Sequence, residues 1–504
     1  MRYFAGIDSG TQSTKVLIAE ESGRVVGRGQ APHTMNEGLG VGHKEQHPSE
    51  WIEALKTAFA QAVKDAGVDA GAIAALGVSG QQHGFVPLDA EGNVIRPAKL
   101  WCDTSTAPEA DAIMQACGGR EAFQRHTGNA LPAGFTASKI LWLKQHEPEN
   151  FARLTTVLLP HDYLNWWLTG EATMEWGDAS GTGLLDVRNR TWCGTAIEAI
   201  DADLAAKLPP LRPSWEAAGK VREEAARALG LSRGVLVAAG GGDNMMGAIG
   251  TGSVSDGMVT VSLGTSGTVY ACADKPVTDP QGEIAAFCDS TGKWLPLLCT
   301  MNVTVATELA KKLFGLKTAE LNELAAAVPA GSDGLLLLPY FEGERVPNVP
   351  DGTGVWFGHN ARTNTPGHFA RAAMEGATLG LNYGFNRMKQ LGIAPAEIRL
   401  TGGGSKSALW RQIVADVFNT PVVCCTEAEG AALGAALQAR WAVERQASGD
   451  AGLGQLAEQW IVVDEATRCV PNAENAQCYA EAQKRHDALS LALRDSFAAH
   501  RASA

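Results

Sequence analysis

Asp243 is the residue in this chain best placed to take a proton from a substrate. It follows the apolar run Val235–Ala239 and three consecutive glycines, and Asn244 then begins a short apolar stretch. Glycines leave the backbone around the carboxylate almost without side-chain cover, so a substrate hydroxyl could reach it. Aspartate is also favoured at the N-terminus of a helix, and the two roles are compatible. Three consecutive glycines are more than a helix cap requires, so we predict that Asp243 is a general base.

A short loop of small and hydroxylated residues occurs twice. Residues 8–14 (DSGTQST) and 262–268 (SLGTSGT) each lie between two apolar runs. About half of the 504 residues separate the loops, which indicates two related halves. Small residues let backbone N–H groups approach phosphate oxygens, and hydroxyl groups add donors without bulk, so we predict a nucleotide polyphosphate site. Its predicted members are Gly10, Thr11, Ser13, Thr14, Lys15, Gly264 and Thr265.

Only the first loop begins with an acidic residue, Asp8, whereas the second begins with Ser262. Mg²⁺ keeps several waters in proteins and takes only one or two carboxylates, so Asp8 is predicted to hold a hydrated Mg²⁺ beside the phosphates. An Asx turn is the structural alternative for this residue. Lys15 could neutralise phosphate charge or could lie solvated on its strand, and both interpretations stay open.

Three glycines, Gly402, Gly403 and Gly404, follow the predicted strand Ile398–Leu400. A backbone without side chains could lie flat against a purine or a ribose, although a tight strand-to-helix turn explains glycines equally well. The chain has no G-x-x-x-x-G-K-[ST] motif, so a nucleotide must be bound by a different kind of loop. We assign the three glycines to adenosine binding.

Polar side chains follow two neighbouring predicted strands in the first half. Gln82 and His83 come after the strand Ile73–Val78, and Trp101 and Asp103 come after the next pair of strands. Amide, imidazole and carboxylate groups can hydrogen-bond a polyol, and an indole can stack on its carbon face. A histidine alone is more often structural, but clustering in the half that contains the predicted base indicates a polyol site. Its predicted members are Gln82, His83, Trp101, Asp103 and Asn244.

The elements that must position these residues alternate between strands and helices, as in an α/β fold. Residues 3–31 are predicted to form three short strands, and Pro48 is predicted to begin a helix with one apolar stripe. Residues 85–88 and 94–95 are predicted to pair as a hairpin. In the second half, a helix over 368–390 is expected to be buried along its length.

Length and composition limit the classes of protein. A chain of 504 residues fits two domains of about 200–250 residues each, which we place at 1–250 and 251–504. The net charge of −13 argues against a nucleic-acid or anionic-membrane partner, because both require a dense basic surface. None of the ten cysteines forms a C-x-x-C pair, and no apolar run approaches about 18 residues. We expect a soluble cytoplasmic protein with reduced thiols and leave a homodimer open.

A series of motifs, in order along nearly the whole chain, resembles the FGGY carbohydrate kinases of the actin and sugar-kinase ATPase superfamily. The matching segments are Ile7–Thr11, Gly80–Gly84, Gly134–Lys139 with Trp142, Leu159–Tyr163, Gly240–Asn244, Ser262–Gly267, Leu338–Arg345 and Thr401–Ser405. Collinear matches of this number are highly specific. The resemblance implies two ribonuclease-H-like α/β domains around a central cleft, with Asp243 as the base and Asp8 near the metal.

The resemblance also implies a reaction. ATP with Mg²⁺ would lie across the domain interface, with its adenosine near Gly403, while a sugar sits on the first domain. Asp243 would take the proton from the sugar hydroxyl that attacks the γ-phosphorus, and the implied substrate is D-xylulose. A kinase for another ketose or polyol is the alternative. A non-kinase ATPase of the same superfamily is a second alternative, against which Asp243, Asn244 and the predicted polyol site all argue.

Two positions depart from the family pattern. Family members that phosphorylate xylulose carry Met where this chain has Gln82. An amide can hydrogen-bond a hydroxyl that a thioether cannot, so this position concerns substrate choice. The second departure is His359, which stands where the family prefers an aliphatic residue, and we expect it to concern packing.

Overall fold

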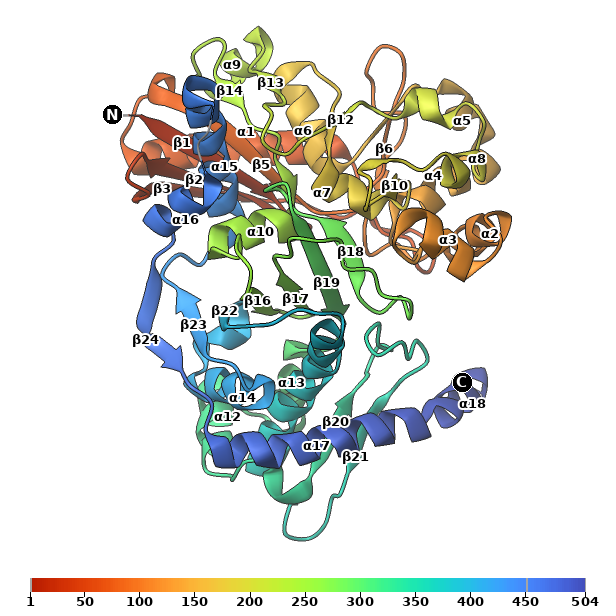
Figure 1. The fold of residues 1–504 in the computed structure, drawn as a ribbon, viewed down its shortest axis with the longest axis vertical. Coiled ribbons are helices and arrows are strands. Elements are labelled where there is room, and N and C mark those ends of the chain that lie inside the picture. The colour runs from red at the N-terminus through yellow and green to blue at the C-terminus, as the bar shows by residue number, and fades with distance from the viewer. Residues whose placement is uncertain (1, 450–451, 504) are drawn as a thin grey trace. The chain divides into compact units, whose positions relative to one another are not determined.

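The computed structural model describes residues 2–449 and 452–503 and divides into two compact units, each with its own sheet and helices (Figure 1). The first unit consists of Met1–Ser255, Cys272–Leu295 and Glu429–Ile461. The second consists of Asp256–Ala271, Pro296–Ala428 and Val462–Ala504. The predicted domains 1–250 and 251–504 stay a prediction.

The first unit contains a mixed sheet in the order β13-β14-β5-β1-β2-β3, with β15 also paired to β5. Strands β1, β2 and β3 are antiparallel neighbours, as the three-strand prediction for residues 3–31 required, whereas β5 and β14 run parallel to β1. The bounds are β1 Tyr3–Ser9, β2 Ser13–Glu20, β3 Val25–Pro32, β5 Ile73–Gly80, β13 Gly219–Lys220, β14 Leu236–Val237 and β15 Gly241–Gly242.

Two long helices pack on this sheet. Helix α1 (Pro48–Ala66) begins at Pro48 as predicted, and His47 caps it by accepting a hydrogen bond from the backbone N–H of Ser49. Helix α15 (Gly430–Ser448) approaches the central strands so closely that a Cβ added at Gly6 would lie 1.8 Å from the carbonyl oxygen of Ala432. Figure 1 shows this helix, in blue, beside β1 and β5. Gly6 of β1 is therefore required for this close approach of the helix to the strand.

Shorter elements surround this core. The predicted hairpin of residues 85–88 with 94–95 is confirmed as a short one: Leu88 forms an antiparallel bridge with Val94, and the backbone N–H of Ile95 donates to the carbonyl of Pro87. Strand β6 also pairs with β8, which the sequence did not predict. The bounds are β4 Glu45–Gln46, β6 Val86–Leu88, β7 Ala98–Lys99, α2 Ala107–Ala116, α3 Arg120–Thr127, α4 Thr136–His146, α5 Pro148–Arg153, β8 Thr156–Leu158, α6 Pro160–Thr169, α7 Trp176–Ala179, α9 Glu223–Leu229, α10 Asp243–Thr251 and α16 Leu453–Trp460.

The second unit repeats the arrangement of the first sheet. Its strands follow the order β19-β17-β16-β22-β23-β24, in which β17 is antiparallel to β16 and β19, whereas β22 and β23 run parallel to β16. The series β19-β17-β16-β22-β23 has the same order of antiparallel and parallel pairs as the series β3-β2-β1-β5-β14. This match confirms the predicted repeated α/β fold. The bounds are β16 Met258–Leu263, β17 Gly267–Ala271, β19 Trp294–Thr300, β22 Glu397–Thr401, β23 Val422–Cys425 and β24 Val463–Cys469.

Helix α13 (Pro366–Gln390) forms the centre of the second unit and is buried along most of its length, as predicted. Arg371 and Glu375 on this helix form an ion pair that also hydrogen-bonds the hydroxyl of Tyr479. The helices around it are α11 Thr304–Phe314, α12 Thr318–Ala326, α14 Ala408–Phe418, α17 Ala473–Ala492 and α18 Arg494–Ser503. Among the helices of the described residues, none combines the length and apolar character needed to span a membrane.

Candidate active site

The ends of three parallel strands of the first unit bring the predicted base and the predicted metal ligand together. Asp8 near the end of β1 pairs with Ser79 on β5, and the Ser79 hydroxyl donates a hydrogen bond of 2.8 Å to the Asp8 carboxylate. Strand β15, which leads into Asp243, pairs with the same end of β5. Because parallel strands end at one edge of a sheet, side chains that follow them share a single site.

Asp243 is the first residue of α10 and is linked through Asn244 to the segment Gly80–Gly84, the sugar loop, which contains the predicted polyol ligands Gln82 and His83. Asp243 Oδ1 accepts hydrogen bonds from the backbone N–H of Asn244 at 2.8 Å and from its Nδ2 at 2.9 Å. Asn244 Nδ2 also donates to Gln82 Oε1 at 2.7 Å. Gln82 is buried, and within residues 2–449 and 452–503 its Nε2 has no hydrogen-bond partner. The chain of hydrogen bonds from the carboxylate therefore ends, through Asn244, at a buried amide donor.

The two carboxylates influence each other. Burial raises the pKa of Asp243 to about 7, and the negative charges of Asp8 and Asp178 act in the same direction. Burial also raises the pKa of Asp8, although the hydrogen bond from Ser79 and the charge of Lys15 oppose that shift. A carboxylate with a pKa near neutrality is well suited to accept a proton from a substrate and release it later.

His83 and Trp101 are held by contacts that orient their rings. His83 Nδ1 lies 3.0 Å from the carbonyl oxygen of Gly181, so this nitrogen carries the proton, and the ring lies 4.6 Å from that of Phe135. Trp101 Nε1 donates to Thr11 Oγ1 at 2.9 Å. A residue predicted for sugar binding therefore contacts a residue predicted for phosphate binding.

Asp103 has a different environment from the other predicted sugar ligands. It is fully buried, and its Oδ2 accepts hydrogen bonds from the backbone N–H of Lys44 and from Lys99 Nζ. Its Oδ1 accepts from the backbone N–H and the hydroxyl of Ser105. Direct sugar binding by Asp103 stays a prediction, but the structure shows a carboxylate whose two oxygens already have four donors.

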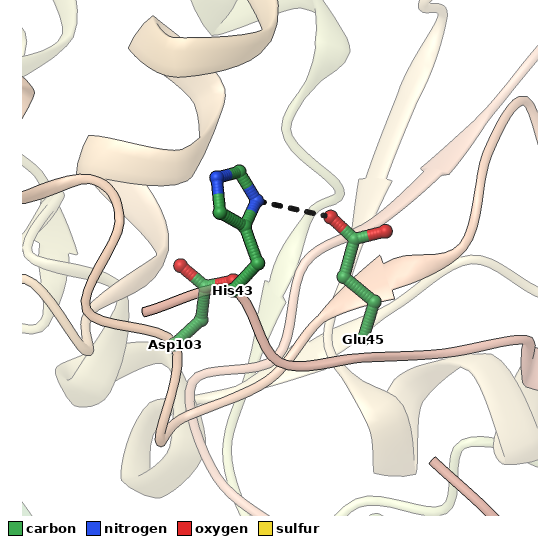
Figure 2. A group of neighbouring side chains, drawn as sticks. All are labelled: His43, Glu45 and Asp103. Atoms are coloured by element: carbon green, nitrogen blue, oxygen red, sulfur yellow. Dashed lines mark ion pairs between the residues drawn. The ribbon is translucent and has the colours of Figure 1, made fainter. Parts of the chain in front are cut away.

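Asp103 lies with His43 and Glu45 in a group whose ligand atoms could surround a cation (Figure 2). The imidazole of His43 points toward the carboxylate of Glu45, at 3.9 Å. However, Lys99 Nζ lies 3.1 Å from His43 Nδ1, 3.3 Å from Glu45 Oε1 and 3.2 Å from Asp103 Oδ2. The same ammonium lies 4.1 Å from the centre of the Trp142 ring. Lys99 supplies the positive charge that this group requires.

The first predicted phosphate loop forms the turn between β1 and β2, where the backbone N–H of Gly10 donates to the carbonyl of Ser13 at 3.0 Å. Thr14 is fully buried, with its hydroxyl 3.1 Å from Ser9 Oγ and 2.8 Å from His33 Nε2. Lys15 Nζ forms an ion pair of 2.6 Å with Glu429. Lys15 and the Thr14 hydroxyl thus have protein partners, and so does Thr11 at the tip of the loop, whose hydroxyl oxygen accepts the hydrogen bond from Trp101.

The second predicted phosphate loop and the predicted adenosine loop are neighbours within the second unit. Gly264 and Thr265 connect β16 to β17, and Gly402 follows β22, which runs parallel to β16. Gly402 has a φ of +86°, and a Cβ added there would lie 2.7 Å from the backbone of Leu263. A Cβ added at Gly403 would meet nothing within 4 Å. The turn explains Gly402, and the backbone at Gly403 is open to a ligand.

Sequence reasoning missed a buried charged group next to this site. His161 Nδ1 lies 2.6 Å from Asp178 Oδ2, and its Nε2 lies 3.1 Å from Asp162 Oδ1. Burial opposes charge on the imidazole, but the two acids raise the pKa of His161 to about 9. The backbone and Cβ of His161 pack against Gly80, the first residue of the sugar loop, and its ring packs against Gly240, which lies before Asp243. Polar residues inside the otherwise apolar segment Leu159–Tyr163 were the available signal.

Comparisons with known proteins agree with this geometry. Models for the N-terminal and C-terminal domains of the FGGY family of carbohydrate kinases match residues 3–250 and 259–443. The chain is 42% identical to a xylulose kinase of Haemophilus influenzae over 490 residues, which cover 96% of this chain and 98% of that protein. It is 35% identical to a xylulose kinase of Escherichia coli over 449 residues, or 88% and 91% of the two chains. A solved structure described as a xyloylose kinase from Brucella ovis matches with a TM-score of 0.90 and 31% identity, covering 98% of this chain and 100% of that one.

Proposed function

Because the chain belongs to the FGGY family of carbohydrate kinases, we propose that it transfers the γ-phosphoryl group of ATP to D-xylulose and forms D-xylulose 5-phosphate. The observation that most strongly supports the proton-transfer step is the Asp243–Asn244–Gln82 chain. In it, Asn244 links a base with a pKa near 7 to a buried amide whose Nε2 has no partner among the described residues. All ten cysteines are free thiols, which suits the reducing cytoplasm as the place of action.

In the proposed reaction, the sugar lies on the first unit against Gln82, His83 and Trp101. Asn244 holds one oxygen of Asp243 by two hydrogen bonds, so the other oxygen faces the substrate hydroxyl and accepts its proton. General-base help is worth about 10²- to 10⁴-fold, so most of the acceleration must come from positioning and from neutralising phosphate charge. We assign that task to the two Gly-Thr loops, with adenosine near Gly403.

Mg²⁺ fits the residues present at Asp8. The hard carboxylate oxygens suit this ion. Asp8 and Asp243 repel each other, and a bound cation would reduce this repulsion. When bound, Mg²⁺ would neutralise charge on the phosphates of ATP. Ser79 orients the Asp8 carboxylate for this role through its 2.8 Å hydrogen bond.

An ADP-release assay with ATP, Mg²⁺ and a panel of free sugars tests the proposal. The panel contains D-xylulose, D-ribulose, L-xylulose, L-ribulose, D-fructose, L-fuculose, L-rhamnulose, glycerol and pentitols. We expect D-xylulose to give the strongest stimulation. A different best substrate would retain the kinase and change the sugar, whereas ADP release that no sugar stimulates would contradict the proposed reaction.

The reaction should slow below neutral pH, because Asp243 must be ionised to accept a proton. With its pKa raised to about 7, each unit of pH below that value should lower kcat/KM about tenfold. Raising free Mg²⁺ should move the midpoint to lower pH, since a cation at Asp8 removes part of the repulsion. The measurement is kcat/KM for the sugar against pH at two Mg²⁺ concentrations, with folding checked at each pH. An acid limb centred near the ordinary carboxyl pKa of about 4 would contradict the assignment.

Replacing Gln82 by Met should reduce discrimination among sugars. The change removes the acceptor for Asn244 and the buried Nε2 donor while keeping similar volume. We expect kcat/KM for the best sugar to fall about tenfold, the effect of one lost hydrogen bond, and to fall less for poor sugars. The same panel measures this, with Gln115→Met on the exposed side of α2 as the control. Equal losses for every sugar would argue against a role in substrate choice.

A further inference from the structure

The buried side chain of Lys139 holds the loop that contains Gln82 and His83. Lys139 lies on α4 and is fully buried. Its Nζ donates to the carbonyl oxygen of His83 at 2.6 Å and to that of Gly134 at 2.5 Å. The hydroxyl of Thr136, one turn earlier on the same helix, also donates to the His83 carbonyl, at 3.2 Å. One carbonyl of the sugar loop therefore receives two donors from a single helix.

His83 has a backbone conformation that its neighbours must maintain. Its φ of +64° lies in the left-handed region, which is uncommon for residues other than glycine and persists only where surrounding contacts hold it. The ring is held by Gly181 and Phe135. A Cβ added at Gly181 would lie 2.1 Å from His83 Nδ1, so the ring has no room to shift in that direction. Lys139 and Thr136 hold the backbone of the same residue.

A lysine is an unusual choice for this position if packing is its only task. Lys139 Nζ donates to two backbone carbonyls, and burial lowers the pKa of its amino group to about 7. A methionine could fill nearly the same volume without desolvating an amino group. The two carbonyl contacts are the feature that an apolar residue could not provide.

We propose that Lys139 is a positioning residue of the sugar site, which fixes the backbone at His83 and thereby places Gln82 against Asn244, the residue that hydrogen-bonds Asp243. The proposal rests on the proposed sugar kinase function. Lys139 would not touch the substrate, and its effect should appear mainly in sugar binding. The nucleotide site should be unaffected, because the amino group donates to the carbonyls of His83 and Gly134, and neither residue belongs to the predicted phosphate or adenosine loops.

The test compares Lys139→Met with Lys144→Met, a matched change on the same helix. Lys144 also donates to a backbone carbonyl, that of Ile200, but lies at the opposite end of α4 and is partly exposed. In Lys139→Met we expect the sugar KM to rise about 10- to 100-fold, with the ATP KM changed less than about twofold. Hydrogen exchange of the peptide over residues 80–85 should become at least about tenfold faster. Lys144→Met should change neither quantity.

The proposal would be overturned if a folded Lys139→Met variant kept both the wild-type sugar KM and the wild-type rate of hydrogen exchange over residues 80–85. If that variant does not fold, Thr136→Val removes the second donor to the same carbonyl and should still raise the sugar KM several-fold; no rise there would also overturn it. The experiment uses the best sugar of the wild-type panel. If the wild-type protein phosphorylates none, the proposed function fails, and hydrogen exchange alone still decides the role of Lys139.

Discussion

Replacing Asp243 by Asn should lower the rate of sugar phosphorylation by about 100- to 10,000-fold, because the amide cannot accept the hydroxyl proton. Asparagine keeps the shape of the side chain, and its Oδ1 can still accept the hydrogen bonds from Asn244. ATP affinity should therefore remain close to that of the wild-type protein. Turnover of the best sugar and calorimetric titration with ATP measure the two quantities. Asp256→Asn, on an exposed loop, is the control. Near-normal turnover in Asp243→Asn would remove this residue from the proposed mechanism.

The same substitution should make the folded protein more stable at alkaline pH. The pKa of Asp243 is about 7 in the folded protein and lower in the unfolded chain, so the folded state holds the proton more tightly between these values. The contribution of Asp243 to the free energy of unfolding of the wild-type protein therefore falls as pH rises from about 4 to 7. Asp243→Asn removes that loss, and its Tm should exceed the wild-type Tm at pH 8 but approach it below about pH 4. A lower Tm at pH 8 would contradict the buried, raised-pKa carboxylate.

Replacing Gly434 by Ala should lower the free energy of unfolding by about 3 kcal/mol, because two helices touch there through their backbones. A Cβ at Gly434 would lie 1.9 Å from the carbonyl oxygen of Met246 on α10, and one at Gly250 would lie 1.7 Å from the carbonyl oxygen of Gly430. The helices must therefore separate to admit even one methyl group. Since α10 begins with Asp243, we also expect turnover to fall.

Urea unfolding of Gly434→Ala and Gly454→Ala measures this effect. Gly454 lies on the exposed side of α16, where an added Cβ would meet nothing within 4 Å. Alanine has the higher helix propensity, so Gly454→Ala should be neutral or more stable by up to about 1 kcal/mol. If the two variants differ by less than about 0.5 kcal/mol, the close contact of α10 with α15 would be contradicted.

Local patterns were sufficient for several parts of the fold. The apolar runs around the first Gly-Thr loop predicted β1 and β2, and proline before an apolar stripe predicted the start of α1. The spacing of apolar residues predicted α13 as a buried helix. These elements depend on neighbours within a few residues, so the chain itself contains the information. The short hairpin of Leu88 with Val94 was predicted because the two residues are near in sequence, whereas the pairing of β6 with β8 was missed because β8 lies far along the chain.

Taken by itself, the sequence determined the α/β class, the repeated Gly-Thr loops, the membership of a kinase family and the candidate base, since each rests on residue types and their order along the chain. Only the tertiary structure decided which buried charges meet. It placed Lys99 among His43, Glu45 and Asp103, and Lys139 against the carbonyl of His83. It also packed α15 on the first sheet. The small residues of that helix indicate close contact, but they do not identify the element that the helix contacts. The physical reason is that burial and contact between distant segments are properties of the packed chain, and a lysine in sequence looks the same whether its amino group ends in water or on a backbone carbonyl.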